Sequence, residues 1–355
     1  MNKGLSSLIN SAFFNLASKR IADLRDSFYI FRVLRNPPKI PNTILFEITN
    51  LCNLKCAFCY QSSNGFKVKK GLMDFELFAK AIEEFAELHR RNHSTGNAVI
   101  YTTGETFLHP QWRKMLSLCS RFNLRSVLST NGNLLDKTNI YALLDARLDY
   151  LNISVEGYDK ESYERKRING NFEQLLDNLQ QMKDIFSSHN GHRPYVVIRA
   201  VVFPQELNHS YYKKYFELWS KFADEIDFNP LSTQAGHMVN EISERNLTGK
   251  RKNCTAPFVQ LTINWDGSVG FCCADYNHVI DIGRFPNTAL FEIWRSPKLM
   301  QVRNAFRKRE YSKIPGICQN CEATFCSTNQ YYKTASFKTT EVFENQSKIY
   351  PWLVK

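Results

Sequence analysis

The stretch of sequence that decides the fold reads Glu47-Ile48-Thr49-Asn50-Leu51-Cys52-Asn53-Leu54-Lys55-Cys56-Ala57-Phe58-Cys59-Tyr60. Its cysteines have the spacing C-x3-C-x2-C. Three thiolates can bind three irons of a [4Fe–4S] cluster and leave the fourth iron without a protein ligand. A metal with an open coordination position can bind a substrate, whereas a fully ligated cluster only carries electrons. The spacing of Cys52, Cys56 and Cys59 therefore predicts a cluster that takes part in chemistry.

The length and composition fit a chain with a large hydrophobic core. Its 355 residues are 43% hydrophobic, which is enough for one barrel-sized domain and a smaller one. The ten cysteines are too sparse for a secreted disulfide scaffold and fall mainly into two groups, so they indicate metal sites in a reducing compartment. We find no secretory signal and no apolar run long enough to span a membrane, and therefore expect a cytoplasmic enzyme.

The formal net charge is +12, which a solvated surface explains as well as a partner does. The partners that fit are an acidic electron donor, a phosphorylated substrate or an anionic membrane surface. A basic group near residue 305 could dock a reduced flavodoxin or ferredoxin. The other positive residues are dispersed, which argues against a nucleic-acid partner. The basic group consists of Arg303, Arg307, Lys308 and Arg309.

The chain divides into a lead-in of residues 1–40, a domain of residues 41–235 and a C-terminal unit of residues 236–355. Apolar residues recur at helical spacing from Leu5 to Phe31 in the lead-in. The lead-in is either a helix packed on the enzyme or an interfacial helix that touches a membrane through residues 1–35.

Strands and helices alternate six times in residues 41–235. Six such units predict an α/β fold, with a parallel sheet curved into a partial (β/α)6 TIM-like barrel. Chemistry in such a barrel lies on the loops after the strands, and the cysteine loop directly follows the first strand. The predicted strands are Thr43–Ile48, Ala98–Thr102, Arg125–Ser129, Tyr150–Ser154, Tyr195–Phe203 and Glu225–Phe228. The predicted helices are Asp74–Arg90, Pro110–Phe122, Asp136–Ala146, Phe172–Phe186 and Ser210–Phe222.

The pattern changes after residue 236. Residues 232–253 resemble a linker. Phe258–Ile263 and Val269–Cys273 flank an Asp-Gly pair and predict a β-hairpin. Leu290–Arg309 predicts one basic helix. The C-terminal unit is therefore expected to consist of a hairpin and a helix.

The cysteine loop and its place after the first strand resemble the signature of the radical S-adenosylmethionine superfamily. The resemblance implies that the open iron binds the amino and carboxylate groups of S-adenosylmethionine. It also implies that one electron from the cluster cleaves this cofactor and releases a 5′-deoxyadenosyl radical. Phe58 would shield the cluster and lie near the adenine.

Further segments resemble the cofactor-binding motifs of this family in the expected order. Thr103-Gly104-Glu105-Thr106 is similar to the Gly-Gly-Glu-Pro loop that binds the methionine amino group, with threonines replacing the first glycine and the proline. Ser129 and Asn131 lie in a segment similar to the third-strand motif, and Ser154 matches a serine that contacts ribose. Arg167 matches the residue that pairs with the cofactor carboxylate, a task suited to a guanidinium. The implied cofactor-binding residues are Phe58, Thr103, Gly104, Glu105, Ser129, Asn131, Ser154 and Arg167.

The C-terminal cysteines resemble the Twitch form of the SPASM auxiliary domain. The resemblance implies that four of them bind one auxiliary [4Fe–4S] cluster, and a structural zinc site is the alternative, since four cysteines also suit tetrahedral zinc. The predicted ligands are Cys254, Cys272, Cys318 and Cys321.

Three cysteines remain outside these two sets. Cys119 lies between apolar residues of a helix and is expected in the core. Cys273 and Cys326 are either packed, inert thiols or catalytic donors of a hydrogen atom to a substrate radical, as an epimerase requires.

These features predict a radical enzyme that abstracts a hydrogen atom and oxidises or epimerises a sugar, an aminocyclitol or an envelope-glycan precursor. The alternative is a maturase of ribosomal peptides that forms a thioether or a crosslink or epimerises a residue. The lead-in is shorter than a peptide-recognition module of roughly 80 residues, which favours a sugar-like substrate. A non-enzymatic electron carrier or a zinc-bound interaction protein is a further class. No general base can be assigned from the sequence.

Overall fold

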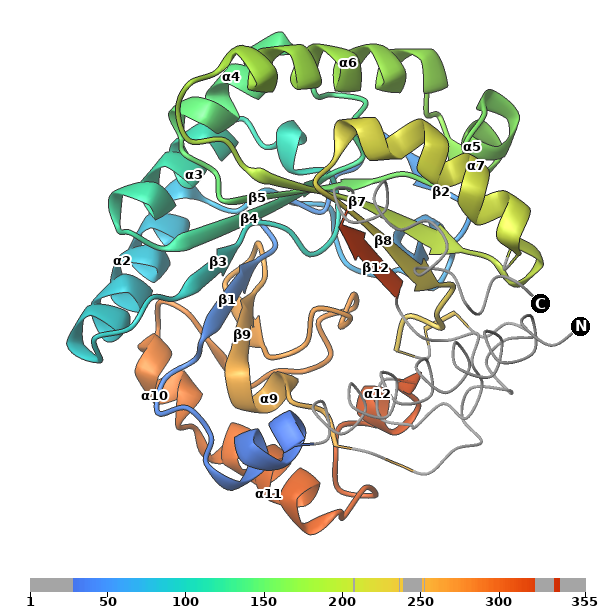
Figure 1. Ribbon diagram of the computed structural model, residues 1–355. Coiled ribbons are helices and arrows are strands. Elements are labelled where there is room, and N and C mark those ends of the chain that lie inside the picture. The colour runs from blue at the N-terminus through green and yellow to red at the C-terminus, as the bar shows by residue number, and fades with distance from the viewer. Residues whose placement is uncertain are drawn as a thin grey trace, which may run out of the picture.

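A parallel sheet forms the centre of the protein. The computed structural model describes residues 28–206, 208–235, 237–238, 251, 253–322 and 335–338. Six neighbouring strands pair in parallel and form a curved sheet with helices on its outer side (Figure 1). In sheet order they are β1 (Thr43–Phe46), β3 (Asn97–Val99), β4 (Arg125–Thr130), β5 (Tyr150–Ser154), β7 (Tyr195–Val202) and β8 (Glu225–Pro230).

The predicted partial (β/α)6 barrel is confirmed. The helices that connect these strands are α2 (Phe75–Arg91), α3 (Trp112–Arg121), α4 (Lys137–Asp145), α6 (Phe172–Ser188) and α7 (His209–Trp219). Asp74, Asp136 and Asn171 cap α2, α4 and α6, because each side chain accepts a hydrogen bond from a backbone N–H of the first turn. The sequence did not predict α5 (Lys160–Lys166), a short helix whose first turn is held by Asp159 and Ser162.

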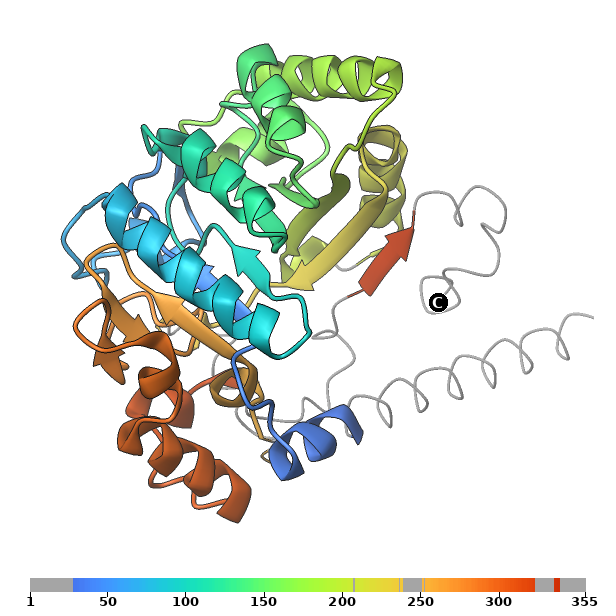
Figure 2. The same ribbon diagram turned by 90° about the vertical axis from the view of Figure 1, so that its left-hand side faces the viewer.

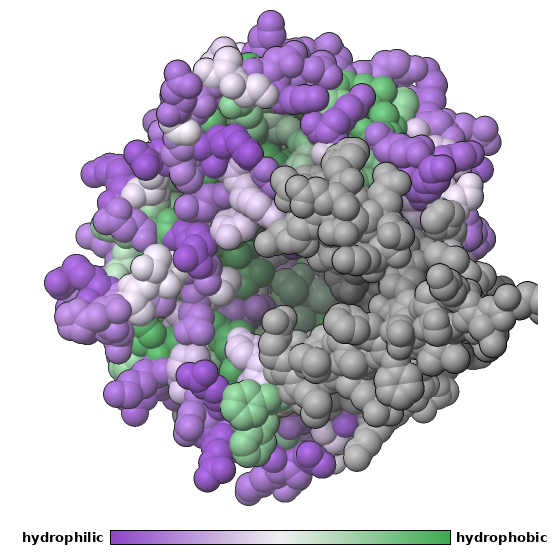
Figure 3. All heavy atoms as spheres, viewed as in Figure 1, coloured by the Kyte–Doolittle hydropathy of each residue, from purple (hydrophilic) through white to green (hydrophobic). Residues whose placement is uncertain are grey.

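Side chains alternate between the two faces of each strand. Ile153 of β5, Ile198 of β7 and Phe228 of β8 are buried and belong to the core under the outer helices. Asn152, Arg199 and Asp227 therefore face the interior of the barrel. These three residues line part of the interior with polar groups. Figure 3 shows hydrophilic side chains over the outer ring and a hollow near the centre, where apolar side chains are also visible.

The C-terminal unit extends the barrel sheet. The hairpin of β9 (Gln260–Ile263) and β10 (Ser268–Gly270) is confirmed, and β9 pairs in parallel with β1. Strand β11 (Gly283–Arg284) follows at that edge, and β12 (Ala335–Lys338) pairs with β8 at the other edge, which gives ten strands. The sequence did not predict this joining, because strand partners far apart in the chain leave no local pattern.

The predicted single helix Leu290–Arg309 is wrong. It is divided into α10 (Leu290–Trp294) and α11 (Pro297–Lys308). Ser296 caps α11, and Pro297 stands at its first position, where a missing N–H has no cost. Figure 2 shows both helices below α2, and Glu84 of α2 accepts a hydrogen bond of 2.6 Å from the N–H of Leu290.

The prediction that Arg303 belongs to an exposed docking surface is wrong. Its side chain is buried, donates 2.8 Å hydrogen bonds to the carbonyls of Pro257 and Trp294, and lies 3.9 Å from the ring centre of Trp294. Burial lowers the pKa of this guanidinium to about 10. Arg303 therefore joins the auxiliary helices, and only Arg307, Lys308 and Arg309 of the basic group are exposed.

The described end of the lead-in, residues 28–35, is helical, with Val33 and Leu34 buried and Phe28 and Phe31 exposed. Most of the lead-in, most of the predicted linker 232–253 and Cys326 lie outside the described residues. No described helix has the length and hydrophobicity needed to cross a bilayer.

We predict that Arg303→Ala lowers the free energy of unfolding by about 2–4 kcal/mol, because two carbonyl groups lose their donor and a cavity opens. Urea denaturation of the full chain measures this change. Lys308→Ala, on the exposed side of the same helix, should stay within about 0.5 kcal/mol of the parent. Equal effects of the two substitutions would contradict the structural role of Arg303.

Candidate active site

The cysteine loop leaves the carboxyl end of β1 and is pinned by a short antiparallel ladder. Strand β2 (Lys55–Cys56) pairs with β6 (Arg167–Ile168), and Cys56 lies opposite Arg167. The N–H of Ala57 donates a 2.9 Å hydrogen bond to the carbonyl of Lys166. The pairing brings the predicted cofactor arginine directly beside the predicted cluster ligands.

The three thiols of this loop interact electrostatically with one another. Burial raises the pKa of each thiol, that of Cys56 to about 12. The positive charge of bound iron is therefore needed to keep them as thiolates. Among the residues that the structure describes, no three His, Cys, Asp or Glu side chains are close enough together to hold one metal ion. A [4Fe–4S] cluster would take one thiolate on each of three irons, and Cys52, Cys56 and Cys59 are the residues that would hold it.

Arg167 already has a partner within the protein. Its buried guanidinium forms an ion pair with the buried carboxylate of Glu156 and lies 5.7 Å from the ring centre of Phe58. The other oxygen of Glu156 accepts a 3.1 Å hydrogen bond from the N–H of Val201. Arg167 thus links β7, Phe58 and the cysteine loop, and its role toward a cofactor carboxylate remains a prediction.

The loop after β3 approaches the cysteine loop very closely. The N–H of Glu105 donates a 2.7 Å hydrogen bond to the carbonyl of Leu51. Gly104 has φ +74°, and a Cβ at this position would lie 2.6 Å from the same carbonyl oxygen. Only glycine fits here without displacing the backbone. The glycine of the predicted cofactor loop is therefore required by the packing of two loops.

Glu105 joins the third predicted motif to this site. Its buried carboxylate accepts a 2.8 Å hydrogen bond from the N–H of Asn131, and burial raises its pKa. The side chain of Asn131 donates a 2.8 Å hydrogen bond to Asn53 in the cysteine loop. Ser129 and Ser154 lie at the carboxyl ends of β4 and β5. The predicted motifs thus converge on one edge of the sheet.

The structure gives a reason for the threonine that replaces the first glycine. Thr103 donates a hydrogen bond to Glu47, which is buried at the end of β1. The second oxygen of Glu47 lies 2.9 Å from Nε2 of His278. Burial lowers the pKa of His278, but the hydrogen bond and the charge of Glu47 outweigh it and raise the pKa. Neither Glu47 nor His278 was predicted, because their pairing joins residues 231 positions apart.

The four C-terminal cysteines also converge. Cys254 precedes α9 (Ala256–Val259), Cys272 follows β10, and Cys318 lies in α12 (Gly316–Gln319) just before Cys321. Cys272 interacts electrostatically with Cys254 and Cys318, and Cys318 also interacts with Cys321. Burial raises the pKa of Cys318 to about 12, so this set also needs a metal charge to be ionised. The residues fit an auxiliary cluster with four thiolate ligands.

The remaining cysteines have different surroundings. Cys119 is fully buried in α3, as predicted. Cys273 is exposed and interacts electrostatically with Tyr101 at the barrel rim and with Tyr276. Its proposed hydrogen-atom donation is compatible with this position and is untested.

Lys70 is a further charge that the sequence did not indicate. Its ammonium group donates a 2.8 Å hydrogen bond to the carbonyl of Asn50 and interacts electrostatically with Cys52 and Cys59. Burial lowers its pKa. Lysine is common on surfaces, and nothing in the local sequence distinguishes this one.

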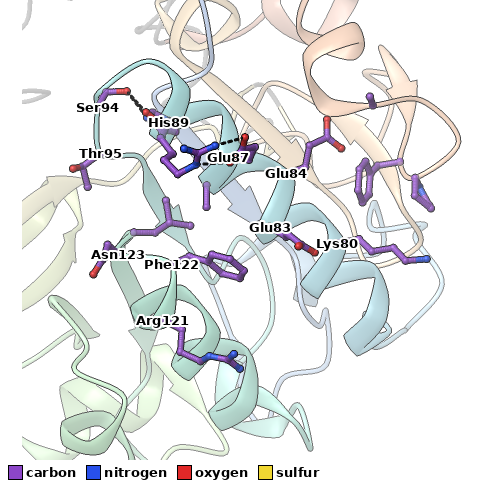
Figure 4. Close-up of a pocket in the computed structure, with 16 residues that line it drawn as sticks. Lys80, Glu83, Glu84, Glu87, His89, Ser94, Thr95, Arg121, Phe122 and Asn123 are labelled. Carbon is purple, nitrogen blue, oxygen red and sulfur yellow. Dashed lines mark hydrogen bonds and ion pairs between the residues drawn. The ribbon is translucent and has the colours of Figure 1, made fainter.

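A groove of about 900 Å³ lies away from these residues (Figure 4). It is lined by the second half of α2, including Glu84 and His89, by residues 121–124 at and after the end of α3 and by the segment at Phe285. Thr95 and Asn123 precede β3 and β4, so the groove is at the amino ends of the strands, opposite the cysteine loop. Barrel chemistry is found at the carboxyl ends.

Two family models match this chain. Residues 46–213 match the radical SAM superfamily, and residues 254–322 match SPASM, an iron-sulfur cluster-binding domain. The chain belongs to the radical SAM superfamily and carries a SPASM auxiliary domain. Its cofactors are accordingly a [4Fe–4S] cluster, S-adenosylmethionine and auxiliary iron–sulfur, which confirms the family prediction and replaces the zinc alternative.

Curated relatives differ in what they make. A PqqA peptide cyclase of Gluconobacter oxydans is 31% identical over 130 residues. The match covers 36% of this chain and 34% of the relative, so the chain spans about a third of that protein's length. An AdoMet-dependent heme synthase of Oleidesulfovibrio alaskensis is 24% identical, and the match covers 82% of both chains. The subtilosin biosynthesis protein AlbA of Bacillus subtilis is 25% identical, with 83% of this chain and 70% of the relative covered.

Solved structures share the fold. BtrN in complex with AdoMet and 2-DOIA has a TM-score of 0.55 and 17% identity, with 82% of this chain and 97% of that chain covered. SuiB of Streptococcus suis bound to the precursor peptide SuiA has a TM-score of 0.58 and 13% identity, with 95% and 78% covered. At this identity the likeness establishes the fold alone.

We predict that Gly104→Ala weakens S-adenosylmethionine binding about fivefold or more, since a strained or displaced backbone costs roughly 1–3 kcal/mol. Equilibrium titration of the reconstituted protein measures the dissociation constant. Gly316→Ala is the control, because a Cβ there meets no atom within 4 Å. An unchanged affinity of the Gly104 variant would refute the packing argument.

Proposed function

We propose that this enzyme oxidises a hydroxyl-bearing carbon of a sugar-like substrate inside the barrel. When bound, S-adenosylmethionine and its cluster supply a radical that removes a hydrogen atom, and the auxiliary cluster supplies an electron acceptor. The observation that carries the proposal is a group of polar side chains on the inner face of β5, β7 and β8 and just after the end of β3. It consists of Tyr101, Asn152, Arg199, Asp227 and Asn229.

The group is organised around the carboxylate of Asp227. One oxygen forms an ion pair with Nε of Arg199 at 3.2 Å and accepts a 3.3 Å hydrogen bond from the side-chain amide of Asn229. Tyr101 accepts a 3.3 Å hydrogen bond from Asn152 and is also hydrogen-bonded to Arg199. The side chain of Arg199 is 44% exposed. Such a set offers both donors and acceptors to the hydroxyl groups of a polyol.

The second oxygen of Asp227 is the proposed general base. It is buried and has no hydrogen-bond partner among the described residues. A buried acceptor without a donor costs about 1–3 kcal/mol, so a substrate hydroxyl would stabilise it. Burial raises the pKa of Asp227, which makes the carboxylate a stronger base. Asp227 would accept the hydroxyl proton as the carbon is oxidised to a carbonyl.

The experiment is an anaerobic assay of the reduced, reconstituted enzyme with carbon-deuterated glucose, glucosamine and myo-inositol. We expect deuterium from at least one of them in 5′-deoxyadenosine, measured by mass spectrometry. A variant with Cys52, Cys56 and Cys59 replaced by alanine should form no deoxyadenosine. Deoxyadenosine without deuterium from any of these compounds would contradict the sugar-like class.

For a compound that passes this test, we predict that Asp227→Asn lowers formation of the carbonyl product about 100-fold or more while deuterium transfer continues, because a general base contributes 10²–10⁴-fold. The ratio of product to deuterated deoxyadenosine measures this uncoupling. Asn208→Ala, which removes the cap of α7, is the control and should leave the ratio unchanged. A parallel loss of both signals would assign Asp227 a purely structural role.

The second candidate is a peptide maturase, and the names of the PqqA peptide cyclase and AlbA favour it. The same assay with deuterated peptides distinguishes it.

Solvent deuterium at the product carbon would instead favour epimerisation, with Cys273 or Cys326 as hydrogen donor. We further propose a flavodoxin or ferredoxin as electron donor in a reducing, cytoplasmic setting, with Arg307, Lys308 and Arg309 as its docking charges.

A further inference from the structure

Gln234 holds the cysteine loop on both sides of Cys59. Its side-chain amide donates a hydrogen bond to the carbonyl of Phe58, and its oxygen accepts a 3.0 Å hydrogen bond from the N–H of Tyr60. One side chain therefore fixes the backbone before and after a cluster ligand. Gln234 has φ +48°, in the left-handed region that non-glycine residues seldom occupy. Such a conformation persists only where its surroundings hold it.

The neighbouring residue is held by the auxiliary cysteine segment. The N–H of Thr233 donates to both carboxylate oxygens of Glu322, each at 2.9 Å. Glu322 directly follows Cys321, and Thr233 is buried with 1% of its surface exposed. Residues 233–234 thus contact the radical cysteine loop with one side chain and the auxiliary cysteine segment with one backbone N–H.

A second auxiliary segment supports the same part of the cysteine loop. Asn277 donates hydrogen bonds to the hydroxyl of Tyr60 at 2.7 Å and to the carbonyl of Gly65 at 3.1 Å, and it accepts one from the N–H of Lys67 at 3.0 Å. The ring of Tyr276 lies 6.0 Å from that of Tyr60. The stretch after Cys59 is therefore held by residues that themselves lie close to Cys272.

We propose that Gln234 is a positioning residue for the first cluster and that Glu322 makes this position depend on the auxiliary cluster. The two residues form a link from Cys321 through Thr233 to both sides of Cys59. Loss of the auxiliary cluster frees the segment at Cys321, and Glu322 then no longer fixes Thr233 and Gln234. The affinity for S-adenosylmethionine is thereby coupled to occupancy of the auxiliary site, and linkage makes this coupling reciprocal.

The inference goes beyond the proposed function and needs no substrate to test. The test is a double-mutant cycle on the full, reconstituted chain, with Cys254→Ala plus Cys318→Ala to remove the auxiliary cluster and Gln234→Ala to cut the link. The dissociation constant of S-adenosylmethionine is measured from the electron paramagnetic resonance signal of the reduced first cluster.

We expect loss of the auxiliary cluster to raise this constant about fivefold or more, at the lower end of typical coupling between sites. The same cysteine substitutions in the Gln234→Ala background should change it less than about twofold, because linked sites are not additive. Equal fold-changes in the two backgrounds, or no change in either, would overturn the proposal.

Glu322 provides a test that leaves every cysteine in place, in case the cysteine variants do not fold. Glu322→Ala should raise the dissociation constant and alter the resonance signal of the first cluster, with an unchanged iron content and melting temperature. Glu322→Gln keeps a carbonyl acceptor for Thr233 and should restore most of the affinity. Gln180→Ala, on the exposed face of α6, is the control. Parental affinity and signal in Glu322→Ala would also sink the proposal.

Discussion

The active site depends on holding an irregular loop in one shape. The cysteine loop has only two residues in a strand, and hydrogen bonds from distant segments fix the rest of it. The β2–β6 ladder holds Cys56, the loop at Gly104 holds Leu51, and Gln234 holds both neighbours of Cys59. A loop that binds a cluster through three ligands needs such support, because metal geometry tolerates little displacement of its ligands.

The auxiliary domain is part of this support. It continues the barrel sheet through β9, and its residues Asn277, His278 and Glu322 reach the segments that hold the radical cysteines or the cofactor loop. The two cluster sites therefore share one hydrogen-bonded framework. A domain attached in this way contributes to the geometry of the first site as well as providing ligands for a second one.

Three ion pairs lie in and around the site. Arg167 is paired with Glu156, His278 with Glu47 and Arg199 with Asp227. Pairing keeps a buried charge from the full cost of desolvation, and it fixes the orientation of each side chain. On the inner face of the barrel, one oxygen of Asp227 has no hydrogen-bond partner among the described residues. A substrate hydroxyl would satisfy this buried acceptor.

The sequence by itself determined the class of this protein. Cysteine spacing, the alternation of strand and helix and the Asp-Gly hairpin are local patterns, and they predicted the clusters, the partial barrel and the auxiliary unit. The start of α11 is a local capping signal, Ser296 followed by Pro297, which the prediction of one basic helix overlooked. Tertiary structure alone decided that Arg303 is buried and that Gln234 touches the cysteine loop. Each of these depends on partners far apart in the chain. Periodicity and capping signals act over a few residues, so they cannot specify which distant groups meet.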